Sequence, residues 1–300
     1  MKLWNHYHTP HSVDEAVAML TRYAGQAKIV AGGTDLLVDM RAEYHGPHEA
    51  LVDVTRIPDM AAITRNGDTI TLGAGVTHAQ IVKSADLRAN ATCLVEGCGV
   101  IGGPQVRNVG TIGGNVAHAL PAGDGTTSLV ALDAEAELIK DGVRQWLPIR
   151  DLFRGAGQSL LDSSRDLLIR FRFQPTTSGQ ATAFARIMRP QGVALPVLGC
   201  AVWVSVADGK FTGARVCVAP SAPIPARAED VEEVLLGAPA NAESIEAAIT
   251  TAQATLKLRT SKYRATADYR YEMVAVLLRK TLTRAVERAE TGAAVPEGVS

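Results

Sequence analysis

Hydrophobic residues recur every three to four positions near both ends of the chain, and this spacing predicts amphipathic helices. Val13, Val17 and Leu20 share one face of the first such helix. Ser12 and Glu15 have the spacing of a capping box, so we expect the helix to begin beside them. The same spacing predicts two further helices, at residues 242–256 and 268–288, and we expect Thr77 and Gln80 to cap another helix.

Short apolar runs bounded by turn residues predict strands between these helices. Three pairs of turn residues, Asn66-Gly67, Asp141-Gly142 and Asp208-Gly209, are typical of tight hairpins. Because strands and helices are mixed along the chain, we expect an α+β fold. The predicted strands are residues 28–30, 51–54, 69–73, 135–140, 143–147, 167–173, 198–206 and 211–219.

The stretch from Glu96 to Gly125 is rich in glycine and has no amphipathic period. We expect it to lack regular structure and to be functional, as long irregular stretches in compact domains usually are. A linker is predicted at residues 175–180. The predicted organisation is an α+β domain over residues 1–176, a smaller α+β domain over residues 177–290 and a flexible tail over residues 291–300.

The composition narrows the class of protein. Hydrophobic residues make up 47% of the chain and charged residues 20%, as in an ordinary globular protein. The 30 basic residues are balanced by 31 acidic ones, so no broad positive field exists to hold nucleic acid or anionic lipid. No apolar run has the length of a membrane span, and the first residues lack the apolar core of a signal peptide. These features predict a cytoplasmic protein.

The four cysteines, Cys93, Cys98, Cys200 and Cys217, are dispersed and form no Cys-x-x-Cys motif. They could in principle hold an iron–sulfur cluster or zinc. However, the last two lie inside apolar runs, and free cysteine is usually a small buried hydrophobic residue. We therefore expect buried thiols rather than a disulfide framework or a metal site.

Two glycine-rich segments, residues 29–36 and 111–115, carry the strongest functional signal. A diphosphate needs close N–H donors, and glycine lets the backbone approach an anion and adopt positive φ angles that aim successive N–H groups at it. Neither segment contains Lys or Arg, so backbone dipoles would hold the anion. Asp35 would repel a phosphate, and we expect it to cap a short helix at residues 36–40. Tight turns without a ligand remain the alternative.

Other candidate motifs are weaker. Residues 97–102 spell Gly-x-Gly-x-x-Gly, but Gly103-Pro104 and the later glycines exclude the long helix that a Rossmann site requires. His6, His8 and His11 have no carboxylate or cysteine at ligand spacing, so surface positions are favoured. The acids of residues 133–137 alternate with apolar residues, which indicates the solvated face of a strand rather than a glycosidase pair. No Gly-x-Ser-x-Gly motif marks a hydrolase.

Three ordered motifs together resemble one family. They are Ala31-Gly-Gly-Thr-Asp-Leu36, then Gly73-Ala-Gly-Val-Thr77, then Arg107-Asn-Val-Gly-Thr-Ile-Gly-Gly-Asn-Val116 followed by Asp124. This succession resembles the FAD subunit of molybdenum hydroxylases, the relatives of xanthine dehydrogenase, carbon monoxide dehydrogenase and aldehyde oxidoreductase. The resemblance covers nearly the whole chain, since residues 265–279, with Tyr269-Arg270, are similar to the family's closing segment.

The resemblance implies a two-subdomain FAD-binding domain of the PCMH/vanillyl-alcohol-oxidase-like type, followed by a smaller α+β domain. It implies that Ile101 contacts the adenine end of FAD, that Asp124 bonds the hydroxyl-bearing chain of the cofactor, and that His118 is a polar contact nearby. Leu168 would touch the ring system, and Arg186 takes the place of a lysine near the flavin. The implied diphosphate contacts are Ile29, Val30, Ala31, Gly32, Gly33, Thr34, Asp35 and Leu36, closed over by Thr111, Ile112, Gly113, Gly114 and Asn115.

The function implied is electron transfer within a larger oxidoreductase. A molybdenum-cofactor subunit would oxidise the substrate, a [2Fe-2S] subunit would pass electrons to FAD, and this chain would release them to NAD⁺, oxygen, a quinone or another carrier. The assembly implied is a dimer of heterotrimers. Two departures affect the site: Arg186 replaces lysine, which changes the geometry of the charge, and Ala194 stands where many relatives carry aspartate. A self-contained flavin oxidase or reductase, and a scaffold without FAD, are the alternatives.

Overall fold

A computed structural model gives the structure of residues 2–42, 44, 47–189, 195–221 and 223–298, hereafter the described residues. They form two compact units, each assembled from separate stretches of the chain. The first unit contains Met1–Gln80, Pro104–Ala119 and Ala134–Gln174, and the second contains Ile81–Gly103, Leu120–Asp133 and Pro175–Ser300. The domain boundary near residue 176 and the tail after residue 290 stay predictions.

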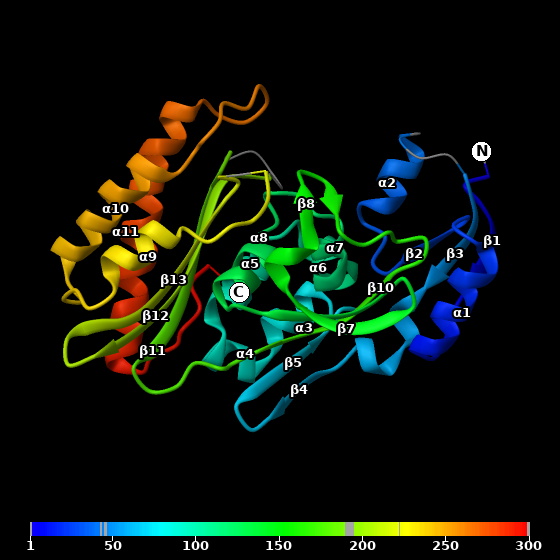
Figure 1. The fold of residues 1–300 in the computed structure, drawn as a ribbon, viewed down its shortest axis with the longest axis horizontal. Coiled ribbons are helices and arrows are strands. Elements are labelled where there is room, and N and C mark those ends of the chain that lie inside the picture. Colours follow the sequence, from blue (N-terminus) through cyan, green and yellow to red (C-terminus); the bar gives the residue numbers. More distant parts are fainter. Residues whose placement is uncertain (1, 43, 45–46, 190–194, 222, 299–300) are drawn as a thin grey trace. The chain divides into compact units, whose positions relative to one another are not determined.

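The first unit contains a three-stranded parallel sheet of order β1-β3-β2. Helices α1 and α2 lie beside this sheet in Figure 1. Met40 of α2 packs with Val30 of β2 and Leu51 of β3 in one apolar cluster, and Leu36 and Leu37 of α2 pack against it. The elements are β1 (Trp4–His8), α1 (Val13–Tyr23), β2 (Ala27–Val30), α2 (Leu36–Arg41) and β3 (His48–Asp53).

A five-stranded antiparallel sheet of order β4-β5-β10-β6-β7 completes the first unit. Its central strand β10 alternates apolar residues with Arg170 and Arg172, as the sequence predicts for a strand with one solvated face. The strands are β4 (Ile63–Asn66), β5 (Thr69–Gly73), β6 (Glu135–Lys140), β7 (Val143–Pro148) and β10 (Leu167–Phe173). The shorter elements are η1 (Val54–Arg56), η2 (Pro58–Met60), α6 (Pro104–Val109), α7 (Ile112–Ala117), η3 (Ile149–Leu152), β8 (Phe153–Gly155) and β9 (Gln158–Ser159).

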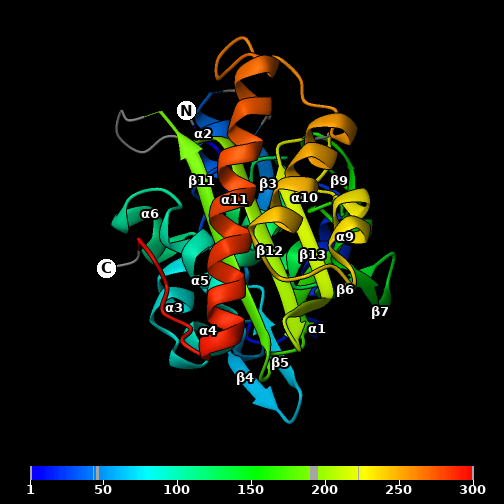
Figure 2. The same cartoon turned by 90° about the vertical axis from the view of Figure 1, so that its left-hand side faces the viewer.

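The second unit has a three-stranded antiparallel sheet of order β11-β12-β13 with helices on both faces. Figure 2 shows the long helix α11 lying across β11 and β12. Leu198, Cys200 and Val202 pack with α11 on one face. On the other face, Thr182 accepts the Cys93 N–H from α5 at 3.0 Å. The elements are β11 (Gln180–Met188), β12 (Pro196–Ala207), β13 (Lys210–Ala219), α4 (Ala85–Asn90), α5 (Thr92–Gly99), α8 (Asp124–Ala131), α9 (Glu229–Leu235), α10 (Ala242–Thr255) and α11 (Ala267–Thr291). Helix α3 (His78–Lys83) contains the first of the points where the chain passes between units.

Local sequence signals gave several elements correctly. The Ser12 hydroxyl accepts the Glu15 N–H at 3.1 Å and caps α1. Helix α3 begins at the predicted capping box, with the Gln80 N–H on the Thr77 hydroxyl at 3.3 Å and the Thr77 N–H on the Gln80 side chain at 2.8 Å. Gly67 has a φ of +57°, as a tight hairpin of this kind requires.

The expectation that residues 96–125 lack regular structure is wrong. The second half of α5, all of α6 and α7, and the start of α8 lie in this stretch. Glycine is a poor helix former in isolation, but Gly97 of α5 lies against α8, where an added β-carbon would be 2.6 Å from Ser128 Oγ. Close packing between helices therefore outweighs propensity here. The sequence also did not predict β1, β11 or α9.

The cysteines are buried, and the acidic residues of β6 pair with arginines. All four thiols are buried, and burial raises the pKa of each. Glu137 is buried rather than solvated, because Arg144 and Arg170 contact its carboxylate at 2.8 and 2.5 Å. Glu135 pairs with Arg172 at 2.7 Å. The expectation of a solvated acidic face is thus wrong for Glu137, whose charge is held by two arginines.

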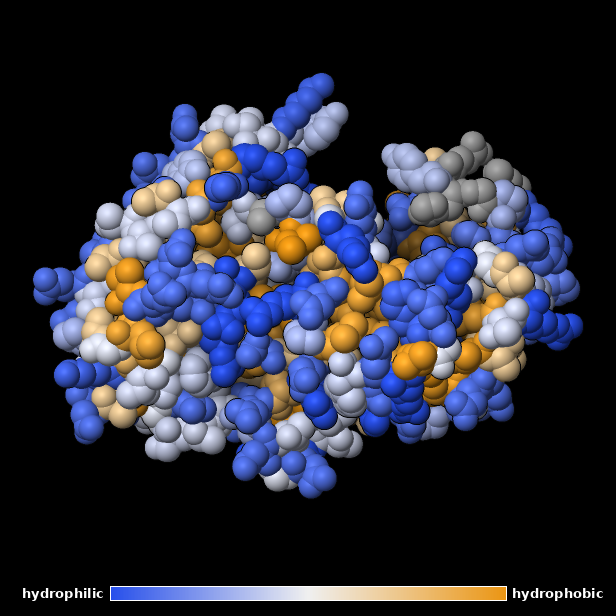
Figure 3. Space-filling model, viewed as in Figure 1, coloured by the Kyte–Doolittle hydropathy of each residue, from blue (hydrophilic) through white to orange (hydrophobic). Residues whose placement is uncertain are grey.

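Hydrophilic side chains cover most of the face shown in Figure 3, and apolar ones are interspersed among them. Among the described residues, no helix combines the length and apolar character needed to cross a membrane.

Candidate functional site

The first glycine-rich segment lies against Val109 and Gly110, which directly precede the second segment, in the first unit. The first segment follows β2, and the second includes the start of α7. A β-carbon added to Gly32 would lie 2.1 Å from the Val109 carbonyl oxygen and 2.8 Å from Gly110 Cα. No side chain fits such a space, so glycine at position 32 is what permits this contact.

The first segment presents backbone donors that the chain itself does not use. The N–H groups of Gly32, Gly33 and Thr34 have no acceptor within the described residues. Gly33 has a φ of +65°, in the left-handed region that glycine adopts without strain. Successive N–H groups in such a turn can form a concave site for an anion.

Four of the five backbone donors of the second segment, all except that of Thr111, bond to acceptors of the first unit. The Gly114 N–H donates to the Thr111 hydroxyl at 3.1 Å, so Thr111 is the N-cap of α7. The Gly113 N–H donates to the Ala74 carbonyl at 2.8 Å. The other two donors bond likewise, Ile112 to the Val76 carbonyl and Asn115 to the Thr111 carbonyl, each at 3.0 Å.

Positive φ angles do not explain the glycines of the second segment, contrary to the prediction. Gly113 and Gly114 both lie inside α7, and neither has a positive φ. Gly113 is required because an added β-carbon would lie 2.6 Å from the Ala74 carbonyl oxygen. Gly114 is exposed, and an added β-carbon would meet only Thr111 Oγ1, at 3.1 Å. What this segment offers a ligand is therefore bare backbone at Gly114, because Thr111 is buried and its hydroxyl caps α7.

The prediction that Asp35 caps the following helix is wrong in its side-chain geometry. Asp35 does precede α2, but its side chain accepts no capping hydrogen bond. Its φ of −98° and ψ of −48° are helical, whereas a capping side chain needs an extended backbone to fold back over the first turn. The carboxylate is exposed.

Backbone hydrogen bonds connect the surroundings of Leu168 and His118 to the second segment. Leu168 is on β10 at a register shift in its pairing with β6. The next residue, Ile169, accepts the Ala74 N–H at 2.9 Å, and the Ala74 carbonyl accepts the Gly113 N–H. His118 follows α7 directly and donates its backbone N–H to the Gly114 carbonyl at 3.0 Å. Ala74 therefore links β10 to the glycine-rich helix.

Asp124 and Arg186 form a buried ion pair in the second unit. Arg186 Nη1 lies 2.6 Å from Asp124 Oδ2, and the two side chains are 8% and 5% exposed. Arg186 Nη2 donates to the Val100 carbonyl at 2.6 Å, directly before Ile101. Arg186 Nε has no partner within the described residues. Burial raises the pKa of Asp124 to about 6, and the facing guanidinium limits that rise.

Two predicted cofactor contacts are thus brought together, since Asp124 and Arg186 bind each other. The arginine is fixed between a carboxylate and a carbonyl, a geometry that the single ammonium of lysine could not reproduce. Ala194, the other departure from the family pattern, lies outside the described residues.

His78 is a residue of this region that sequence reasoning missed. Its backbone N–H donates to the Gly110 carbonyl at 3.0 Å, and its side chain is 3% exposed. Burial, helped by the nearby charge of Arg107, lowers the pKa of His78 to about 4, so the ring is neutral at pH 7. Nδ1 has no partner within the described residues. A lone histidine carries no spacing signal, and only its place after Thr77 in the second family motif could have marked it.

The first unit suits the diphosphate of a dinucleotide cofactor. Three N–H donors at residues 32–34 are available to an anion. Gly32 leaves no room for a side chain, and Gly114 presents bare backbone. Neither segment contains a basic residue, so backbone N–H groups would make the contacts. The Rossmann alternative is excluded locally, because Gly97 and Gly99 lie within α5 rather than in a turn between a strand and a helix. This fold and site define a flavoprotein subunit with an α+β architecture outside the Rossmann class.

Comparisons with known proteins identify the family. Residues 3–174 match the FAD binding domain in molybdopterin dehydrogenase, and residues 182–285 match the CO dehydrogenase flavoprotein C-terminal domain. The chain therefore belongs to the FAD-binding medium subunits of the molybdenum hydroxylase family. The resemblance and the α+β fold seen in the sequence are confirmed.

The relatives are similar over nearly their full length. The carbon monoxide dehydrogenase medium chain of Hydrogenophaga pseudoflava is 31% identical over 282 residues, which cover 94% of this chain and 97% of that one. The xanthine dehydrogenase FAD-binding subunit of Escherichia coli O157:H7 is 27% identical over 286 residues, 94% and 96% of the two chains. The solved carbon monoxide dehydrogenase from H. pseudoflava that lacks the Mo-pyranopterin moiety superposes with a TM-score of 0.89 at 32% identity, over 96% and 99% of the chains.

Proposed function

We propose that this chain is the electron-transfer subunit of a molybdenum-containing hydroxylase or dehydrogenase. In this proposal a partner with the molybdenum cofactor oxidises the substrate and a partner with [2Fe-2S] clusters passes the electrons to this chain. The chain then delivers them to an external acceptor. The complex would be a cytoplasmic dimer of heterotrimers. FAD supplies the redox chemistry, since no protein side chain here takes up and releases electrons as a flavin does.

The observation that carries the proposal is the set of unused donors at Gly32, Gly33 and Thr34, held against Val109 and Gly110. These N–H groups would bind the diphosphate, and the exposed backbone at Gly114 would approach it from the second segment. Because backbone dipoles are fixed by the fold, they need no reorganisation when the cofactor binds. Residues 29–36 and 111–115 are thus proposed to hold the diphosphate.

The remaining residues of the proposed site orient the other parts of the cofactor. Asp124 would accept a hydrogen bond from the hydroxyl-bearing chain, and Arg186 fixes the Asp124 carboxylate through the 2.6 Å ion pair. Ile101, His118 and Leu168 are proposed contacts of the adenine end, the polar chain and the ring system, on the basis of the family resemblance.

The relatives also support a division of labour between subunits. They are medium or FAD-binding subunits of enzymes named for carbon monoxide and for xanthine, two unlike substrates. If one fold serves both, the substrate is recognised elsewhere in the complex. We infer that the same holds for this chain.

The direct test is to purify the native complex through an affinity tag on this chain. We expect FAD, molybdenum and iron to co-elute, with one FAD and four iron atoms for each copy of the tagged chain, as two [2Fe-2S] clusters require. Tagged chain that carries FAD but elutes alone, with neither metal, would favour the self-contained flavoenzyme. A colourless chain that added FAD cannot reconstitute would favour the scaffold.

A further inference from the structure

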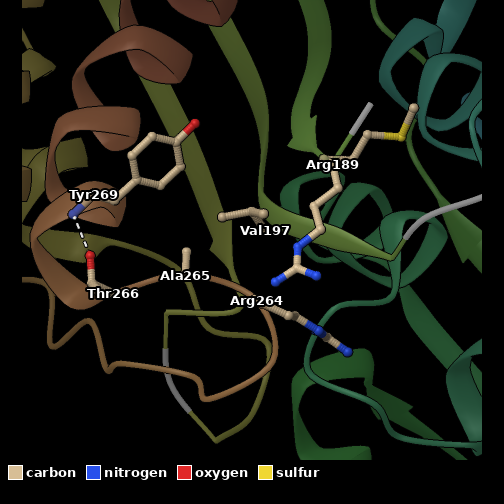
Figure 4. A pocket seen from close by; sticks show the side chains of 7 residues that line it. Arg189, Val197, Arg264, Ala265, Thr266 and Tyr269 are labelled. Atoms are coloured by element: carbon tan, nitrogen blue, oxygen red, sulfur yellow. Dashed lines mark hydrogen bonds between the residues drawn. The ribbon is translucent and has the colours of Figure 1, made fainter. Parts of the chain in front are cut away.

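A pocket of about 350 Å³ lies in the second unit, between the end of β11 and the start of α11. Figure 4 shows Arg189 and Arg264 on the same side of it, with Arg189 extending toward the Arg264 side chain. Met188 and Val197 line its apolar part, and Tyr269 stands at the other end from the two arginines. None of these residues belongs to the proposed FAD site.

The two facing arginines have no acidic partner. Neither Arg189 nor Arg264 forms an ion pair within the described residues. The sequences on both sides explain this, since residues 187–207 and 247–267 contain no acid at all. The second of these stretches contains four basic residues, Lys257, Arg259, Lys262 and Arg264. Arg189 is exposed and Arg264 is half-buried, so both guanidinium groups are open to an anion from solvent.

The neighbouring Arg270 shows the same excess of positive charge. Its side chain is 2% exposed, Nη1 donates only to the Pro220 carbonyl at 3.3 Å, and Nε has no partner within the described residues. Burial and the nearby charges of Arg264 and Arg259 lower the pKa of Arg270. Asp268, in the first turn of α11, is exposed and forms no ion pair among the described residues. Among the described residues, these arginines therefore have no acidic partner that offsets their positive charge.

We propose that this pocket binds a phosphate-bearing small molecule with an aromatic ring. The phosphate would lie between Arg189 and Arg264, whose planar guanidinium groups match phosphate oxygens in pairs. The ring would pack on Tyr269 and on the apolar wall formed by Met188 and Val197. The pocket is larger than a single phosphate needs, which is why an organic part is included in the ligand.

Binding can be tested without turnover, so the result does not depend on the proposed electron-transfer role. The FAD-loaded complex would be titrated with ADP, inorganic phosphate and adenosine in a calorimeter at low ionic strength. We expect saturable ADP binding, weaker phosphate binding and no measurable adenosine binding. R189Q and R264Q should each weaken ADP binding at least about tenfold, because each removes one of two charge-assisted contacts. Tyr269→Ala should weaken ADP binding but leave phosphate binding unchanged.

The control is Lys280→Gln, which removes an exposed charge from α11 outside the pocket. It should leave ADP binding unchanged. If it weakens binding as much as R264Q does, only general charge attraction is present and the proposal fails. Equal binding of ADP and adenosine, or ADP binding that appears only after FAD has been removed, would also overturn it. R264K keeps the positive charge that R264Q removes. If R264K recovers part of the ADP affinity that R264Q loses, the loss comes from the missing contact and not from a misfolded loop, which supports the site.

Discussion

At the scale of single residues, glycine has two different physical roles in the candidate site. At Gly33 it permits a φ of +65°, whereas at Gly32 and Gly113 it permits backbone contact that any β-carbon would block. The sequence predicted that these glycines matter and that they lie in two segments. It could not predict which role each has, because that depends on Val109 and Ala74, which arrive from other parts of the chain.

Gly33→Ala and Gly67→Ala form a matched pair of variants. Both positions have a positive φ near +60°, so backbone strain should lower the unfolding free energy by roughly 1 kcal/mol in each variant. Gly33→Ala should lose somewhat more, because its β-carbon would lie 3.3 Å from Leu37 Cδ1. Only Gly33 lies in the proposed diphosphate site, and only Gly33→Ala should lower FAD affinity, by about tenfold. Flavin fluorescence titrations and urea melts measure the two quantities. Equal FAD affinity in both variants would show that residues 32–34 form a turn without a cofactor role.

Asp124 should leave a signature in the pH dependence of stability. Its pKa is raised from the ordinary 3.8 to about 6, so the folded state holds a proton that the unfolded state has released between these values. The unfolding free energy of the wild type, minus that of Asp124→Asn, should therefore fall as pH rises from 4 to 7, by at most about 3 kcal/mol. Thermal or urea melts across this range give the difference. A difference that rises with pH would show that the Arg186 ion pair, rather than burial, controls this carboxyl.

At the scale of elements, the sequence predicted the helices and strands whose formation depends on residues close together in the chain. The capped helix at Ser12, the capping box at Thr77 and the strand Leu167–Phe173 all depend on neighbours in sequence, and the structure has them. Helices α5 and α8 were missed because their burial is nearly complete, which removes the amphipathic period. Such helices are stabilised by tertiary packing, which a single sequence does not display.

The contact between α5 and α8 can be tested through Gly97 and Ser128. Gly97→Ala should lower the unfolding free energy by about 1–3 kcal/mol, because the new methyl group would lie 2.6 Å from Ser128 Oγ. Ser128→Ala removes that oxygen, so the double variant should lose less than the two single variants together. Rescue should be partial, since the Asp124 carbonyl oxygen also lies 2.9 Å from the added carbon. Additive losses in urea melts would contradict the packing described.

At the scale of the whole molecule, the sequence could not predict how stretches combine into units. Glu96 of α5 accepts the Phe184 N–H of β11 at 2.7 Å and pairs with Arg288 of α11 at 2.6 Å. These partners lie 88 and 192 residues away, and no periodicity or turn signal relates them. The family resemblance predicted the fold class because it carries such long-range information, whereas composition and spacing alone gave only a mixed α+β protein with two glycine-rich segments.

The central claim is that this chain transfers electrons and leaves substrate oxidation to a partner. The most direct measurement is anaerobic: the purified FAD-loaded chain is mixed with azaheterocycles and aldehydes, and the flavin absorption band is followed over time. The account predicts that dithionite bleaches the band, that these compounds do not, and that adding the molybdenum and iron–sulfur subunits restores bleaching by the true substrate. Rapid bleaching of the isolated chain by an organic substrate would contradict the account and identify a self-contained flavoenzyme.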